Sequence, residues 1–168
     1  MLPLLLKNIT FLTNNKGYTG YAGLTATFVD CTFNGCIFLY GNTTFEGCTF
    51  NVSDDNYNLW TWSANVATFN KCEFNSDGKA LLVYGGANTK LLLNDCIFND
   101  NGGLEDMKAA VETGSGYGAK YEIIASKTVV NGYEINDKGI NTGSTLWGNK
   151  NAMTTSELNV VIDGVDVY

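Results

Sequence analysis

A six-residue segment recurs along this chain and constrains its fold more than any other feature of the sequence. Each copy has apolar or small residues at its first, fourth and sixth positions and mostly polar residues between the first and the fourth. The copies begin 17 to 37 residues apart, so a fixed core alternates with segments of variable length. This pattern is typical of a solenoid, which tolerates insertions between stacked repeats. Five clear copies begin at Leu6, Phe28, Phe45, Phe69 and Leu93, and two weaker copies begin at Ala125 and Ile162.

The two middle polar positions interrupt the alternation of a straight strand, in which successive side chains point to opposite faces. The chain must therefore turn a corner inside each copy. One strand precedes this corner and a very short strand follows it. A third strand often appears beyond a second corner, as at 37–40, 59–62, 80–84 and 109–113. Three strands per repeat, stacked repeat upon repeat, predict three parallel sheets around one core.

Asparagine occupies the second corner in five copies, at Asn34, Asn51, Asn75, Asn99 and Asn131. Asparagine tolerates the left-handed backbone that a tight corner needs, and stacked asparagine amides can hydrogen-bond to one another. This column resembles the asparagine stack of the pectate-lyase-like superfamily of right-handed β-helices, and also the repeat regions of bacterial surface proteins. The resemblance covers roughly residues 4 to 168 and implies an architecture rather than an activity.

The repeat and the resemblance together predict an all-β fold. We expect a right-handed parallel β-helix solenoid of about six to seven coils with three short strands per coil. Residues 1–168 are expected to form a single β-helix domain, as a fragment of a longer protein. Loop insertions are expected near 52–58, 102–120 and 133–157.

The two ends of a solenoid expose apolar core and unpaired strand edges unless something covers them. Here Leu2, Leu4, Leu5 and Leu6 begin almost directly on a coil, and residues 165–168 stop on one. We therefore predict that flanking domains of the same chain cover the ends, or that the ends pair with another copy. The alternative is that the insertion at 133–157 folds over one end.

Four of the five cysteines share the fourth position of the repeat, where Ile9, Thr128 and Val165 stand in other copies. Such a position suits a small buried side chain, so we predict an interior column of free thiols. Stacked strands spread the sulfurs along a line with about 4.8 Å per step, whereas zinc needs ligands that converge on one point. The sequence therefore predicts no metal site and no cofactor. The four cysteines are Cys31, Cys48, Cys72 and Cys96; Cys36 lies on a third strand.

The charge of the chain argues against several classes of partner. The net charge is -7, and lysine supplies every basic residue, because the chain has no arginine or histidine. Such a chain lacks the basic surface of a protein that binds nucleic acid or anionic lipid. No apolar run approaches the roughly 18 residues that span a bilayer. The abundance of Asn, Gly and Thr is common on exported bacterial proteins, so we expect an extracellular or cell-surface location.

No catalytic residue is predicted. Enzymes that resemble this fold cut acidic polysaccharides, with an arginine or lysine base and calcium or with clustered aspartates and a histidine, and neither pattern carries over to this chain. Asp54–Asp55 and Glu105–Asp106 are interpreted as solvated loop charges rather than as a catalytic pair. The GxGxG segment at 114–118 is not followed by a helical pattern, so it does not predict a phosphate site.

The third strands carry apolar residues on both faces, and only one face can point inward. We align Ala109, Val111 and Thr113 with the aromatic face, which places Glu112 outside and the Tyr/Trp face inside. The opposite face then forms an exposed stripe that predicts a contact surface. Cover by the 102–120 or 133–157 insertions is the alternative. The predicted contact stripe is Ile37, Leu39, Leu59, Leu81 and Val83.

The leading hypothesis for function is a non-catalytic module of a bacterial surface or secreted protein, serving as adhesin, spacer or binding scaffold. One alternative is a carbohydrate-active module that binds or cleaves polysaccharide. Another is a segment of a phage or secreted fibre whose coils trimerise. The expected partners are a glycan or a host or cell-surface protein. The candidate ligand-binding residues are Asp54, Asp55, Tyr57, Trp60 and Trp62.

Overall fold

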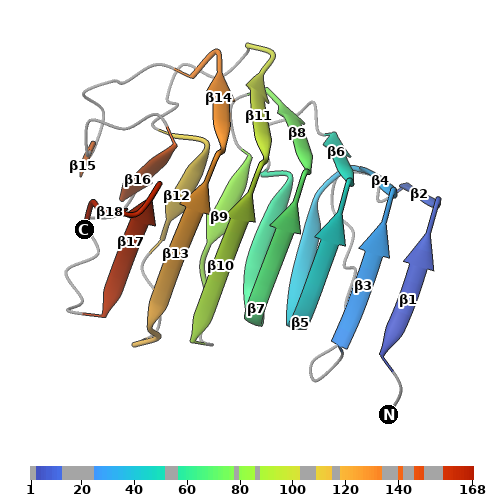
Figure 1. Cartoon of the computed structure of the whole chain (residues 1–168), viewed down its shortest axis with the longest axis horizontal. Helices are drawn as coiled ribbons and strands as arrows, with labels where there is room; N and C mark the ends of the chain where they lie inside the picture. Colours follow the sequence, from blue (N-terminus) through green and yellow to red (C-terminus); the bar gives the residue numbers. More distant parts are fainter. Residues whose placement is uncertain are drawn as a thin grey trace.

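The computed structural model describes residues 3–12, 25–51, 57–77, 80–85, 88–102, 109–114, 118–133, 140–141, 146–149 and 157–168. These residues form eighteen strands and no helix, and most strand pairs are parallel. The predictions of an all-β fold and of parallel sheets are therefore confirmed. Figure 1 shows the strands side by side along the long axis, with the N-terminus at one end of the row and the C-terminus at the other.

Seven strands pair side by side in a parallel row that we call the front wall. Each ends in the first residues of one repeat copy. The apolar first position of the copy packs in or against the core from Phe28 through Ile162. The row consists of β1 (Leu4–Lys7), β3 (Thr25–Val29), the second parts of β5 (Ile37–Glu46) and β7 (Leu59–Asn70), β10 (Thr89–Asn94), β13 (Tyr121–Ser126) and β17 (Leu158–Ile162).

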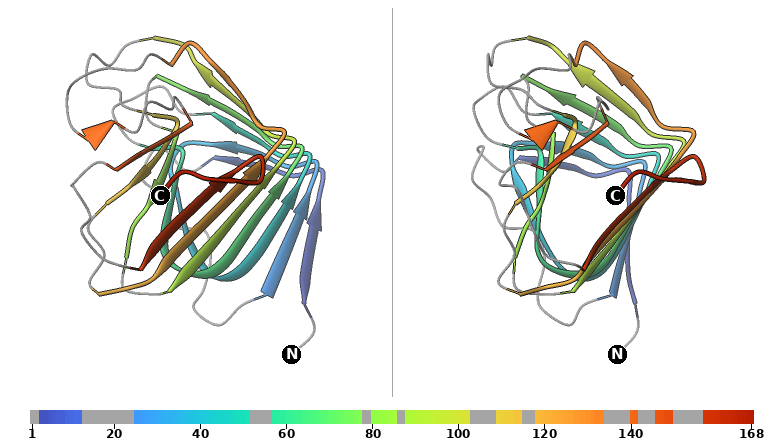
Figure 2. Two further views of the ribbon diagram at one scale, coloured as in Figure 1. Left: turned by 60° about the vertical axis from the view of Figure 1, so that its left-hand side comes forward. Right: turned by 90° about the vertical axis from the view of Figure 1, so that its left-hand side faces the viewer.

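A second parallel row, the back wall, belongs to the same sheet because β5 and β7 bend from one wall into the other (Figure 2). Gly41 of β5 lies at this bend with a φ of 68°. The register of β5 against β7 shifts twice there, between Phe38 and Tyr40 and between Gly41 and Asn42. The back wall consists of the first parts of β5 and β7, followed by β9 (Leu81–Val83), β12 (Val111–Thr113) and β16 (Trp147–Asn149).

The second sheet lies above the two walls in Figure 1 and holds the last residues of each repeat copy. All its strand pairs are parallel. Together with the two walls it surrounds one core, which is consistent with a β-helix or another solenoid (Figure 2). Its strands are β2 (Thr10–Leu12), β4 (Thr32–Asn34), β6 (Thr49–Asn51), β8 (Glu73–Ser76), β11 (Ile97–Asp100) and β14 (Val129–Asn131).

The left-handed backbone lies at the first corner of each repeat and not at the column asparagines themselves; at the second corner it falls on glycines that follow them, Gly35 and Gly132. The third position of the repeat has a positive φ in copy after copy, for example 51° at Asp30 and 54° at Lys71. The column asparagines instead end strands of the second sheet and are absent from the positive-φ residues. The prediction that Asn34, Asn51, Asn75, Asn99 and Asn131 adopt the left-handed conformation is therefore wrong.

The amide ladder that the same asparagines predict is present. Each amide nitrogen donates to the Oδ1 of the asparagine in the preceding strand of the sheet, at 2.9 to 3.0 Å from Asn51 through Asn131. A second ladder runs along the end of the front wall, where Asn94 donates to Asn70 and Asn70 to Glu46, each at 2.7 Å. Side-chain hydrogen bonds therefore run parallel to the stacking direction along two edges.

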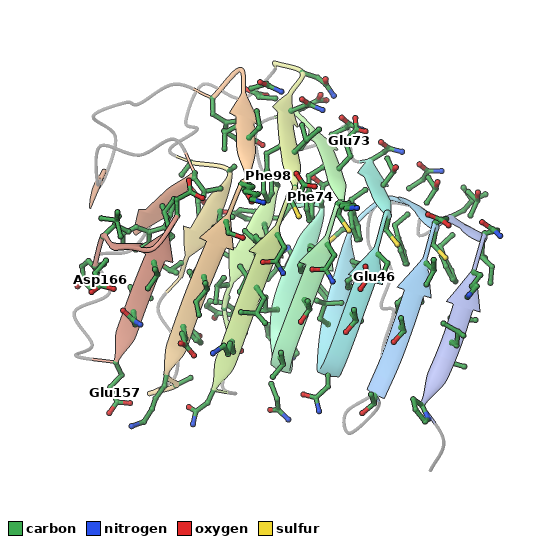
Figure 3. The ribbon with its side chains drawn as sticks, in the orientation of Figure 1. Glu46, Glu73, Phe74, Phe98, Glu157 and Asp166 are labelled. Carbon is green, nitrogen blue, oxygen red and sulfur yellow. The ribbon has the colours of Figure 1, made fainter. Side chains whose placement is uncertain are left out.

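The core consists of side-chain columns that repeat from strand to strand. Phe74 and Phe98 stack at a centroid distance of 4.4 Å and an interplanar angle of 7° (Figure 3). The same stack extends back through Phe50 and Phe33 to Phe11. The four cysteines of the repeat are free and buried, and each sulfur approaches two backbone carbonyls, as Cys96 Sγ approaches those of Phe69 (3.4 Å) and Asn94 (3.5 Å). Cys36 is also free and buried.

The back wall shows that the predicted contact stripe is wrong. Its five residues are 0 to 2% exposed and form part of the core. The cause is an error of one residue in the expected alignment of β12. The structure pairs Val111 with Leu81 and Glu112 with Leu82. Because a strand alternates its faces, a shift of one residue exchanges inside and outside. The buried stripe is Ile37, Leu39, Leu59, Leu81 and Val83.

The C-terminal end differs from the expected seventh repeat copy. Val165 does not join the cysteine column: it is 63% exposed and lies in β18 (Val165–Asp166), which pairs antiparallel with β17. On the back wall, β15 (Ile140–Asn141) likewise pairs antiparallel with β16. Strands therefore form inside two of the ranges expected as insertions, β12 within 102–120 and β15 and β16 within 133–157. At this end, both walls finish in an antiparallel pair made by the same chain.

The N-terminal end lacks such an antiparallel pair among the residues that the structure describes. The front wall begins at β1, which pairs with β3, and the second sheet begins at β2, which pairs with β4. Large apolar side chains on these two strands are exposed, including Leu5 at 55% and Leu12 at 76%. We call β1 and β2 the N-terminal edge.

Candidate functional site

The outer face of the back wall carries a row of large side chains in register. Phe38 of β5 pairs with Trp60 of β7, Trp60 with Leu82 of β9, and Leu82 with Glu112 of β12. These positions point outward because their neighbours Ile37, Leu59 and Leu81 fill the core. The side chains of this row that point away from the core are apolar or aromatic at Phe38, Trp60 and Leu82, and the row ends in Glu112. Only part of this face is open to solvent, because Leu82 is 4% and Glu112 6% exposed.

Four aromatic rings on this face form a contiguous cluster, which we call the aromatic platform. Phe38 meets Trp60 edge-on at 5.4 Å and Trp62 in a stacked arrangement at 6.1 Å. Tyr84 completes the cluster at 6.0 Å from Trp60 and 5.7 Å from Trp62. Trp62 is the most exposed of the four residues at 37%; Phe38, Trp60 and Tyr84 are half-buried, and the indole nitrogen of Trp60 is buried. The platform therefore presents aromatic surface to solvent from a paired sheet.

Hydrogen bonds and small residues hold the platform in place. The Tyr84 N–H donates to the buried Thr61 Oγ1 at 3.2 Å, and the Thr61 hydroxyl lies 3.5 Å from the Tyr84 carbonyl. A Cβ at Gly114 would lie 2.7 Å from the Tyr84 ring, so glycine leaves the space that this ring occupies. A Cβ at Gly85, where φ is 131°, would lie 1.8 Å from the Trp62 carbonyl oxygen. The two backbone segments that carry Trp62 and Tyr84 therefore approach closely.

Tyr57 and Glu112 form a buried polar pair beside the platform. Tyr57 is 4% exposed and Glu112 6%, and the Tyr57 hydroxyl donates to Glu112 Oε2. Tyr57 also meets Trp60 edge-on at 5.7 Å. Burial, the negative charge of Glu112 and the hydrogen bond to it together raise the pKa of Tyr57 above its usual range. Tyr57 therefore remains a neutral donor that satisfies a buried carboxylate.

Of the candidate ligand-binding residues, the structure brings three together and leaves two untested. Tyr57, Trp60 and Trp62 lie in one cluster on the outer face of the back wall. Asp54 and Asp55 lie outside the described residues. Phe38, Tyr84 and Glu112 also belong to this site, and the sequence pattern did not predict them. The alternation of side chains in β5, β9 and β12 could have indicated these residues. The incorrect alignment of β12, however, placed the aromatic face inside and Ile37, Leu39, Leu59, Leu81 and Val83 outside.

The described residues include no group of three His, Cys, Asp or Glu side chains that could hold a metal ion. Within the same residues, no helix is long and apolar enough to cross a membrane. The platform itself offers aromatic surface, and the Tyr57–Glu112 pair lies beside it.

Fold and site together define an all-β protein of parallel sheets with an aromatic platform on one outer face. Comparison with known proteins adds no narrower class. The chain matches no protein-family model, no curated protein and no solved structure.

Proposed function

We propose that the chain is a right-handed parallel β-helix, with three strands per coil, of the pectate-lyase-like type. Seven strands in the front wall and six in the second sheet support the expected six to seven coils. The bending of β5 and β7 from the back wall into the front wall supports continuous winding. The asparagine ladder supports the likeness to the superfamily.

We infer that this solenoid is a non-catalytic binding module of a bacterial surface or secreted protein, and that its platform binds a glycan. The observation that carries this inference is the partly exposed cluster of Phe38, Trp60, Trp62 and Tyr84 on a paired sheet. Exposed contiguous apolar surface of this kind marks a contact site. The rigid rings of Trp and Tyr combine a large apolar face with a polar group, so they suit sugar rings, which have apolar C–H faces and polar hydroxyl edges.

A glycan array tests the proposal. The wild-type chain is expected to bind at least one glycan, and Trp62→Ala is expected to lower that binding at least tenfold. Ile97→Ala is the matched control, because Ile97 is 41% exposed on the second sheet, away from the platform. An array without signal, or binding that Trp62→Ala leaves unchanged, contradicts the proposal. Release of reducing or unsaturated ends from a bound polysaccharide contradicts the non-catalytic assignment.

The N-terminal edge is the end that we propose to pair with further β-structure, either a flanking coil or a second copy of the chain. The backbone groups of an edge strand are free to pair with another strand, and exposed Leu5 and Leu12 add apolar surface. At the opposite end, β18 and β15 run antiparallel to the last wall strands. This difference between the ends favours association at the N-terminal edge.

A further inference from the structure

An open, shallow groove of about 430 Å³, whose lining residues are mostly polar, crosses the middle of β7 and the starts of β10, β13 and β17 on the front wall. Three exposed asparagines line it: Asn65, Asn88 and Asn159. Two ion pairs line it as well, Lys90–Glu122 and Lys120–Glu157, each at 3.0 Å. Glu157 marks the position of the groove at the lower end of β17 in Figure 3.

Buried hydrogen bonds fix the floor of this groove. Tyr121 is 1% exposed, and its hydroxyl donates to the Gly85 carbonyl at 2.7 Å. Thr89 is also buried and donates to the Ala64 carbonyl at 2.6 Å. The Lys120 N–H donates to Asn88 Oδ1 at 2.9 Å, which ties two rim segments together. The groove is therefore built on paired strands and held at its corner by side chains.

The groove and the aromatic platform are neighbours around one corner of the solenoid. Along β7, Trp62 of the platform is followed three residues later by Asn65 of the groove. Gly85 directly follows Tyr84 of the platform, and its carbonyl accepts the hydrogen bond from Tyr121 in the groove floor. A ligand longer than one ring can therefore contact both surfaces.

The side chains of the groove suit a neutral ligand rich in hydroxyl groups. An asparagine amide both donates and accepts hydrogen bonds, as a sugar hydroxyl does. The two lysines and two glutamates pair with each other, so their formal charges sum to zero. They are exposed enough for a ligand hydroxyl to join the pairs without uncovering a buried charge. The net charge of -7 disfavours a polyanionic glycan.

We propose that this groove binds successive sugar units of a neutral oligosaccharide while the aromatic platform stacks against an adjoining unit. The proposal rests on the glycan-binding function proposed above and adds a second surface and a ligand class. Asn65 and Asn159 supply hydrogen bonds from opposite ends of the groove. The Lys90–Glu122 pair supplies donors and acceptors between them.

Isothermal titration with a panel of hexasaccharides tests the groove. The neutral probes are cellohexaose, xylohexaose and mannohexaose, and the acidic probe is hexagalacturonate. At least one neutral probe is expected to bind, with hexagalacturonate at least tenfold weaker. Asn65→Ala and Asn159→Ala are each expected to raise the Kd of that probe about fivefold or more. Asn101→Ala is the matched control, because Asn101 is exposed beyond β11 and outside the groove.

The outcomes separate the groove from the platform. In one outcome, Trp62→Ala abolishes binding while Asn65→Ala and Asn159→Ala leave it unchanged. That outcome overturns the proposal that the groove binds the ligand and supports binding at the platform. Preference for hexagalacturonate overturns the neutral ligand class alone. Absence of binding to every probe overturns the groove, while the glycan array decides the function of the platform separately. Circular dichroism of each variant shows whether its fold is retained.

Discussion

The amide of Asn75 donates a hydrogen bond of 3.0 Å to Asn51 Oδ1, and its own Oδ1 accepts one of 2.9 Å from Asn99. Asn75→Ala removes both bonds, so that Asn51 Oδ1 loses its donor and the Asn99 amide keeps only Glu73 Oε1, at 3.2 Å, as an acceptor. We expect the free energy of unfolding to fall by about 1 to 3 kcal/mol. Urea denaturation measures the change, with Asn159→Ala as a surface control. If both variants have the same free energy of unfolding, the asparagine ladder contributes no more to stability than an exposed asparagine does.

At the left-handed first corner of the repeat, a substitution is expected to increase the stability of the chain, in contrast to Asn75→Ala. Lys71 has a φ of 54°, a conformation that costs a residue with a Cβ about 1 to 2 kcal/mol and costs glycine little. Lys71→Gly is therefore expected to stabilise the chain by roughly 0.5 to 1 kcal/mol, after allowance for the greater freedom of glycine when unfolded. Lys90→Gly, in an extended strand, is the control and is expected to destabilise. A loss of stability in Lys71→Gly would refute the steric argument.

Buried tyrosines predict that stability depends on pH in alkaline solution. Burial raises the pKa of both Tyr57 and Tyr133, and Glu112 adds to the effect at Tyr57. A raised pKa in the folded state contributes stability that is complete below the unfolded pKa of about 10 and is lost as the pH rises above it. Unfolding free energies from pH 8 to 11.5 should therefore stay level and then fall by about 1.4 kcal/mol per pH unit for each buried tyrosine.

Tyr57→Phe separates the two contributions to this alkaline loss. Removing the phenol of Tyr57 is expected to reduce the slope above pH 10 by about one proton, while Tyr133 still contributes. Ile97→Ala is the control, because it changes an exposed residue without removing a titratable group, and it should keep the wild-type slope. An unchanged slope in Tyr57→Phe would show that the buried pair does not resist ionisation.

The N-terminal edge predicts self-association of residues 1–168. Light scattering at increasing concentration is expected to show a dimer, because edge strands and exposed leucines can pair between copies. Leu5→Lys together with Leu12→Lys should restore the monomer by placing charge on the edge. Ile97→Lys, on the outer face of the second sheet, should leave the dimer intact. A monomeric wild-type chain at all concentrations would exclude a second copy as the partner of this edge.

Local patterns were sufficient to predict the repeat, the parallel sheets and the columns of the core. The positions of Phe74 and Phe98 in successive copies already indicate that they stack, and the shared position of Cys72 and Cys96 indicates a buried column. These predictions succeed because stacked copies place equal repeat positions next to each other. The asparagine ladder follows for the same reason, although the backbone conformation assigned to it was wrong.

The sequence by itself determined which residues recur and therefore which stack, but only the tertiary structure decided which face of the back wall is buried. Both faces of strands 37–40 and 59–62 are apolar, so alternation alone cannot choose between them. The choice depends on the pairing of Glu112 with Leu82 rather than with a neighbour one residue away. The groove likewise joins Asn65, Asn88 and Asn159 from segments far apart in the chain. Register and corner geometry are non-local, because they depend on how each strand packs against the next.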